Sequence, residues 1–175
     1  MFPYTFRCTL SHNKSYISGP IRIINLNGKH INDTNVYENV YIGKYSVINK
    51  GVSLQYNTEK RNIDNDKIKS VAIGHDVYID ENVTLLDGVT VNNGCVIGKN
   101  NYINYDVPCY SIVMNNKVVG YRYSSEVIDM LQDIQWWNWS SEQLETNKWF
   151  FKLSLYKKYT KEGIENILLK LKSKD

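Results

Sequence analysis

Hydrophobic residues recur at every sixth position along much of the chain. Between residues 70 and 107 these positions are all aliphatic: Ile73, Ile79, Leu85, Val91, Ile97 and Ile103. A helix repeats its apolar face every 3.6 residues and a strand every two, so neither element alone explains a strict period of six. An upstream block keeps the same spacing: Val36, Ile42, Ile48 and Leu54.

Hexads of this kind predict an all-β solenoid, a parallel β-helix in which short strands coil and stack. The aliphatic residue of each hexad points inward and stacks on its equivalents in neighbouring coils. The fifth residue is small or β-branched in most hexads and fits a corner, while Gly, Asn and Asp supply the turns. Asn101 is an exception at this fifth position, and a buried amide there needs hydrogen-bond partners.

The pattern predicts three parts along the chain. Residues 1–35 form an N-terminal arm and cap, and residues 36–113 form the β-helix. The polar stretch 56–70, which falls outside the hexad register, is an excursion loop. Residues 114–175 form a C-terminal helical region, because the apolar spacing becomes helical after Ser124 and again over 160–172. A capping box formed by Ser140 and Gln143 marks the start of a further helix.

Composition narrows the class of protein. The 175 residues are 42% hydrophobic and 22% charged, as in soluble globular proteins. A net charge of +3 is too small to indicate nucleic-acid binding, and no apolar run reaches the ~18 residues of a membrane helix. The three cysteines have no C-x-x-C spacing, so neither a disulfide framework nor a metal site is expected. Because the sequence starts without a signal-peptide pattern, we expect a cytoplasmic protein.

Three segments together resemble a known family. They read IGKYSVINKGVSLQ, IGHDVYIDENVTLLDGVTVNNGCVIGKNNYINYDVPCYSIV and IQWWNWSSEQL. This chain is similar to the hexapeptide-repeat acetyltransferases, and within them to the xenobiotic (chloramphenicol and streptogramin) acetyltransferases and their sugar-modifying relatives. The resemblance covers roughly residues 36–145, and Trp136-Trp137-Asn138-Trp139 is its most specific part.

The resemblance implies a left-handed parallel β-helix, a homotrimer and active sites at subunit boundaries. It also implies acetyl-CoA as the acyl donor. The expected activity is transfer of an acetyl group to an amine or hydroxyl of a small molecule, with a sugar in surface-polysaccharide biosynthesis as the acceptor. A catalytically silent β-helix, kept as a scaffold or binding module, is the alternative.

The chain departs from the family at the general base. Family members carry a loop histidine that removes the acceptor's proton. Counted from Leu54, that position here is Arg61, whose guanidinium stays protonated and cannot take a proton. The histidines of this chain lie elsewhere: His12, His30 and His75. The candidate catalytic residue is His75, although a lone histidine is more simply a residue of a surface turn. Asp64 and Asp66 in the loop are further candidates.

The residues at the family's acetyl-CoA-binding positions also differ from those of the family. The resemblance assigns cofactor binding to these positions: Tyr78, Lys99, Asn101, Asn116 and Lys117. In the family, small residues here let pantetheine approach the backbone. In this chain the family's GAGS segment becomes residues 98–101, a shortened loop covers 114–117, and Asp80 stands where the family has glycine. An amine acceptor, which can attack without a protein base, would suit a site changed in this way.

Overall fold

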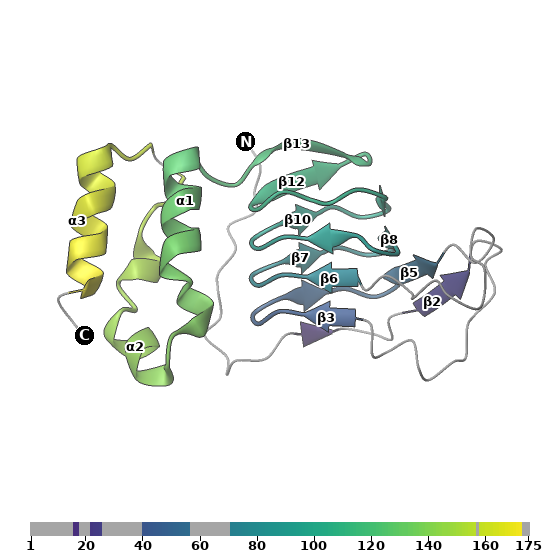
Figure 1. Ribbon diagram of the computed structural model, residues 1–175, viewed down its shortest axis with the longest axis horizontal. Helices are drawn as coiled ribbons and strands as arrows, with labels where there is room; N and C mark the ends of the chain where they lie inside the picture. The colour runs from purple at the N-terminus through teal and green to yellow at the C-terminus, as the bar shows by residue number, and fades with distance from the viewer. Residues whose placement is uncertain (1–15, 18–21, 26–39, 57–70, 157, 173–175) are drawn as a thin grey trace. The chain divides into compact units, whose positions relative to one another are not determined.

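The computed structural model describes residues 16–17, 22–25, 40–56, 71–156 and 158–172 (Figure 1). These residues fall into two compact units, each of which is described by itself. A β unit ends at Arg122, and a helical unit begins at Tyr123.

The β unit consists of short strands joined by tight turns. In chain order they are β1 (Tyr16–Ile17), β2 (Arg22–Asn25), β3 (Val40–Ile42), β4 (Val47–Ile48), β5 (Ser53–Tyr56), β6 (Val71–Ile73), β7 (Tyr78–Ile79), β8 (Thr84–Leu86), β9 (Thr90–Val91), β10 (Val96–Ile97), β11 (Tyr102–Ile103), β12 (Ser111–Met114) and β13 (Lys117–Tyr121).

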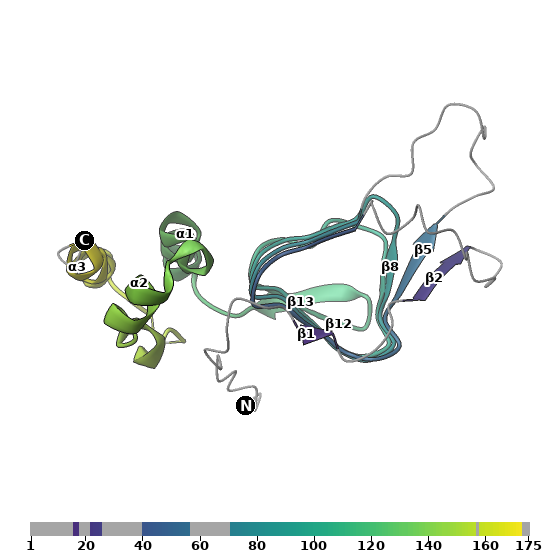
Figure 2. The same ribbon diagram turned by 90° about the horizontal axis from the view of Figure 1, so that it is seen from below.

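The strands form three sheets in which most strands pair with the strand three places along the chain, whereas β10 pairs with β12 and β12 with β13. The sheet orders are β1-β4-β7-β10-β12-β13, β11-β8-β5-β2 and β3-β6-β9. The pairs in these sheets are parallel, apart from the antiparallel pair β12–β13. Figure 2 looks along the stack, so the strands of one sheet lie behind one another. The prediction of stacked parallel strands is confirmed.

The hexad aliphatics form the core of this unit. Ile79 pairs with Ile97, and Leu85 with Ile103, so partners lie three hexads apart. All six aliphatics from Ile73 to Ile103 are fully buried. Full burial of one such side chain contributes about 1.5–3 kcal/mol. A period of six therefore appears because one strand and one turn together occupy six residues.

One corner of the β unit stacks four turns whose second residue has a positive φ. These residues are Tyr45 (φ 61°), Asp76 (φ 55°), Gly94 (φ 71°) and Tyr110 (φ 57°). Backbone bonds join consecutive turns: Gly94 N–H donates to the carbonyl of His75 at 2.8 Å. Gly94 has a second reason to be glycine, because a Cβ there would lie 2.3 Å from the Tyr110 ring.

The β unit extends further than the sequence indicates. Residues from 114 on were expected in a helical region, but Met114 ends β12 and residues 117–121 form β13. Asn115 (φ 52°) and Asn116 (φ 62°) make the two-residue turn between them. Asparagine tolerates these φ values, and such a turn matches the twist of a hairpin. Tyr56 ends β5, whereas the rest of the predicted loop, 57–70, lies outside the described residues, as does the predicted boundary at residue 35.

The helical unit contains α1 (Ser125–Ile134), η2 (Trp136–Asn138), α2 (Ser141–Thr146), η3 (Phe150–Lys152) and α3 (Lys161–Lys172). The predicted capping box is present: Ser140 Oγ accepts from Gln143 N–H at 3.1 Å, and Gln143 Oε1 accepts from Ser140 N–H at 3.0 Å. Aromatic rings pack edge to face between these elements: Trp136, Trp137, Trp139, Trp149, Phe150 and Phe151. Among the described residues, no helix has the length and apolar character to cross a membrane.

Candidate active site

His75 lies in the corner turn between β6 and β7, where its side chain caps the backbone of the preceding turn. Its Nδ1 accepts a hydrogen bond from Lys44 N–H at 2.8 Å. Its own N–H donates to Asn93 Oδ1, also at 2.8 Å. Lys44, His75 and Asn93 each stand two residues after a hexad aliphatic. His75 and Asn93 therefore perform the same task in successive coils.

This geometry fixes the tautomer of His75. Half-burial, followed by the positive charge of Lys44, lowers the pKa of the imidazole from its ordinary value. The ring is therefore neutral at neutral pH, and because Nδ1 accepts a hydrogen bond, Nε2 carries the proton. To accept a proton, Nδ1 would have to give up Lys44 N–H. The arrangement favours the turn-residue interpretation over general-base catalysis.

Four of the five residues predicted to bind the cofactor lie together at another corner. The buried Asn101 donates from Nδ2 to Gly98 carbonyl at 2.7 Å, and its Oδ1 accepts from Asn116 N–H at 2.6 Å. Asn116 Oδ1 in turn accepts from Tyr102 N–H at 2.7 Å. The amide of Asn101 is thus paired with the backbone, and it holds the β12–β13 turn against the turn that follows β10.

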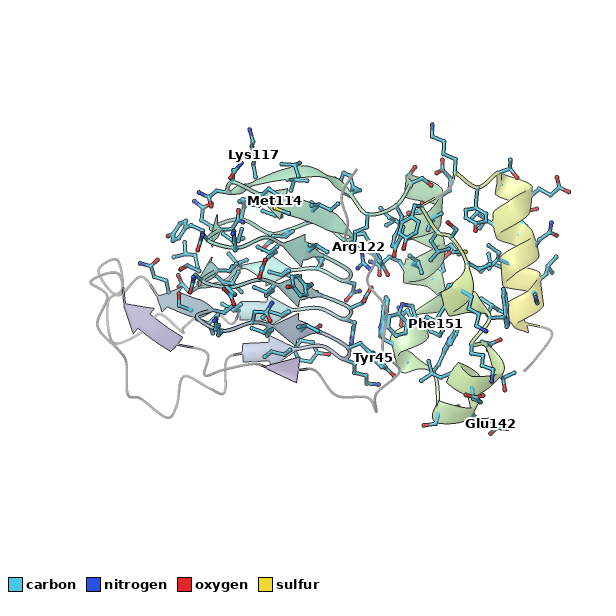
Figure 3. The ribbon with its side chains drawn as sticks, turned by 180° about the vertical axis from the view of Figure 1, so that it is seen from behind. Tyr45, Met114, Lys117, Arg122, Glu142 and Phe151 are labelled. Atoms are coloured by element: carbon cyan, nitrogen blue, oxygen red, sulfur yellow. The ribbon has the colours of Figure 1, made fainter. Side chains whose placement is uncertain are left out.

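Lys99 and Lys117 flank this pair of asparagines. Asn101 Nδ2 also reaches the carbonyl of Lys99, at 3.3 Å, and Lys117 follows Asn116 in the chain. Both lysine side chains are exposed, so two cations are available to an anionic ligand at this corner. Figure 3 shows Lys117 and Met114 at the same end of the hairpin.

Tyr78 occupies a different place. It stands on β7 in register with Val96 of β10, and its hydroxyl accepts from Asn49 Nδ2 at 2.9 Å. The phenol is half-buried on the outer side of the sheet, because its neighbour Ile79 points into the core. Tyr78 thus lies along the same sheet as Gly98 and Met114, one coil away from the asparagine pair.

Gly98 keeps the family's glycine, but Met114 lies against it. A Cβ at Gly98 would lie 2.3 Å from Met114 Sδ. One coil earlier, the Asp80 carboxylate accepts from the N–H of Glu81 at 2.8 Å. The outer side of the Gly98 backbone is therefore covered by the Met114 side chain.

An ion pair that the sequence did not indicate stabilises the corner formed by the stacked positive-φ turns. Arg122 Nη1 donates to Asp76 Oδ2 at 3.0 Å and to Gly94 carbonyl at 2.7 Å. The guanidinium lies over the Tyr110 ring, 5.6 Å from its centroid. Burial raises the pKa of Asp76, and the attraction of Arg122 opposes that rise. Arg122 lies 46 residues from Asp76 in the sequence, a separation at which no local pattern operates.

The other candidate bases, Asp64 and Asp66, lie outside the described part of the chain. So do Arg61, at the position of the family's base, and the two remaining histidines, His12 and His30. Within the described ranges, no group of His, Cys, Asp and Glu side chains could hold a metal ion.

Comparison with curated proteins identifies relatives among acetyltransferases, although no family model matches the chain. A probable macrolide acetyltransferase of Lysinibacillus sphaericus is 40% identical over 77 residues, which is 43% of each chain. A chloramphenicol acetyltransferase of Klebsiella aerogenes is 35% identical over 81 residues, covering 45% of this chain and 39% of that one. The matched stretch thus spans about two fifths of the length of these relatives.

Solved structures give weaker likenesses. A hexapeptide-repeat acetyltransferase of Vibrio cholerae has 19% identity and a TM-score of 0.42, covering 63% of this chain and 72% of that one. A serine acetyltransferase of Neisseria gonorrhoeae has 19% identity and a TM-score of 0.43, covering 66% and 42%. Over the residues matched in the curated relatives, the chain resembles macrolide and chloramphenicol acetyltransferases, which confirms the resemblance to the xenobiotic branch that its three sequence segments indicate.

Proposed function

We propose that this protein is an acetyltransferase that moves an acetyl group from acetyl-CoA to an amine or hydroxyl of a small molecule. The observation that carries the proposal is the 40% identity with a probable macrolide acetyltransferase over 77 residues. The parallel strands paired three hexads apart support a β-helix, and the resemblance to the family implies that it is left-handed. On this proposal the chain acts as a cytoplasmic homotrimer with sites at subunit boundaries.

The acyl donor would lie along the outer side of the sheet that contains β7, β10 and β12. Lys99 and Lys117 would attract its phosphates, since both ammonium groups are exposed. Asn101 and Asn116 would fix the corner that carries these lysines. Tyr78, half-buried one coil away, would form part of the wall beside the pantetheine arm.

The state of His75 favours an amine as the acceptor. A neutral amine can attack the thioester carbon without help from a protein base. The N–C bond then forms and the C–S bond breaks, water takes the proton from nitrogen, and the departing thiolate takes a proton from water. A backbone N–H on the coil would stabilise the oxyanion that develops on the carbonyl oxygen. A sugar amine of surface-polysaccharide biosynthesis fits this chemistry, whereas a hydroxyl would need a base such as Asp64 or Asp66.

A silent scaffold is the second candidate, and two observations favour it. Arg61 stands where the family has its base, and Met114 covers the glycine that the family leaves open. A protein that no longer binds acetyl-CoA would tolerate both changes.

Ligand-induced stabilisation and turnover separate the two candidates. A ligand at about one hundred times its Kd stabilises the folded state by about 2.7 kcal/mol, which raises Tm by several degrees. We expect acetyl-CoA to raise Tm in the wild type and less in Lys99→Ala, while Lys152→Ala, an exposed lysine of the helical unit, behaves as wild type. We also expect thiol release with a panel of amino sugars. An unchanged Tm with millimolar acetyl-CoA and with CoA would refute the proposal, and thiol release would exclude the silent scaffold.

A further inference from the structure

The thioether of Met114 occupies the space directly outside the α-carbon of Gly98. A Cβ built on Gly98 would lie 2.3 Å from Met114 Sδ and 3.2 Å from its Cε. Gly98 is buried, yet it follows Ile97, whose side chain fills the core. Because successive residues of a strand face opposite sides, Gly98 faces outward. Its burial is therefore due to a cover on the outer side, and Met114 is part of that cover.

The register of the strands sets this contact. Val113 pairs with Ile97, and Gly98 N–H donates to Val113 carbonyl at 3.0 Å. Val113 is fully buried, so Met114, the next residue, faces outward above Gly98. Met114 itself is only half-buried. Its side chain thus spans the gap between a glycine and the solvent.

The backbone around the contact is held in place, whereas the methionine is free to change rotamer. Asn101 binds the carbonyl of Gly98 and the N–H of Asn116, which fixes both turns. A methionine side chain has three rotatable bonds and adapts readily to its surroundings. The element that can yield here is therefore the Met114 side chain, and its displacement would expose the Gly98 backbone beside Lys99.

We propose that Met114 is a displaceable side chain that covers the acyl-CoA site at Gly98 and thereby weakens acetyl-CoA binding. This inference rests on the proposed function. Once Met114 has moved, the exposed backbone of Gly98 would contact the flexible, amide-containing arm of an extended ligand. Lys99 and Lys117 would then bind the phosphate end of that ligand. In the wild-type protein the Met114 side chain must move before the arm of acetyl-CoA reaches Gly98. A shorter residue at position 114 removes the free-energy cost of this movement.

Titration calorimetry of the full chain with acetyl-CoA tests the inference. We expect Met114→Ala to lower Kd about fivefold, which corresponds to about 1 kcal/mol. Met114→Leu keeps the volume and serves as the matched control, with Kd within about twofold of wild type. Met114→Val, which suits a strand, provides a second shortened variant with a smaller gain in affinity. Tm of each variant without ligand reports whether it is folded.

A double variant tests the place at which the arm approaches. In the Met114→Ala background, Gly98→Ala has room for its methyl group, so we expect a folded protein that loses the gain in affinity. Wild-type binding with the same or a larger Kd in Met114→Ala would overturn the inference and leave the proposed function standing. Failure of both wild type and Met114→Ala to bind would overturn both. Binding by Met114→Ala alone would support the inference that Met114 blocks the site and would overturn the proposed function for the wild-type protein.

Discussion

Replacement of His75 tests whether this residue stabilises the turn or takes part in catalysis. His75→Ala removes the acceptor of Lys44 N–H, which is a 2.8 Å hydrogen bond at a half-buried corner. Such a bond contributes about 0.5–1.5 kcal/mol. For a chain of this length that loss lowers Tm by about 1–6 °C. His75→Asn should recover most of it, because Asn93 provides the same acceptor to His75 one coil later.

The pH dependence of stability gives a second readout. Burial and the charge of Lys44 lower the pKa of His75 in the folded protein below its ordinary value of 6.5. As pH falls below this ordinary value, the unfolded chain binds a proton before the folded one, so the folded state loses stability. The loss ends once pH is below the folded pKa. His75→Asn cannot titrate, so its stability relative to wild type should rise as pH is lowered through this range.

Urea denaturation at several pH values between about 5 and 8, together with thiol release, measures both effects. We expect His75→Asn to be as stable as wild type at pH 8, less sensitive to acid, and equally active. Equal stability of His75→Ala and wild type at pH 8 would refute the capping role. A stable but inactive His75→Asn would show that the imidazole acts in catalysis and not merely in the turn.

Three further substitutions test the architecture. Arg122→Ala should destabilise the fold by about 2 kcal/mol in urea denaturation because it leaves the partly buried Asp76 without this partner. Arg122→Lys should recover little, since an ammonium cannot reproduce the guanidinium fork. Leu85→Ala, at a fully buried core position, should cost about 2–5 kcal/mol, and a loss below about 1 kcal/mol would contradict the stacked core. Gly94→Ala should abolish folding or lower Tm strongly, because its Cβ would collide with the Tyr110 ring. Gly120→Ala serves as the control and should leave Tm unchanged, since a Cβ there would meet nothing within 4 Å. Equal Tm values for the two variants would contradict the described corner.

The sequence predicted the parts of the fold that depend on a repeated local pattern. The hexad aliphatics are buried because each occupies the inward position of its strand, and that position recurs with every turn. Asn115 and Asn116 were read as a loop before a helical region, although a pair of asparagines between apolar residues is also a hairpin signal. The ion pair of Arg122 and Asp76 has no such signal, because it joins residues that only the coiling brings together.

In the candidate site, too, the sequence predicted which residues take part but not the contacts between coils. Sequence placed the two lysines and two asparagines among the cofactor-binding residues, and the structure brings all four to one corner. The state of His75 could not be predicted, because it depends on a backbone N–H from the preceding coil. The contact of Met114 with Gly98 likewise depends on the register between β10 and β12.

The pairing of strands three hexads apart constrains how such a gene can change its length. Duplication of three whole hexads would add a layer in which every aliphatic meets the same kind of neighbour, so the protein could grow or shrink in these steps without redesign. Duplication of a single hexad would keep each aliphatic inside but would move every downstream residue to the next side of the stack. The asparagines and lysines beyond the insertion would then no longer share a side with Tyr78.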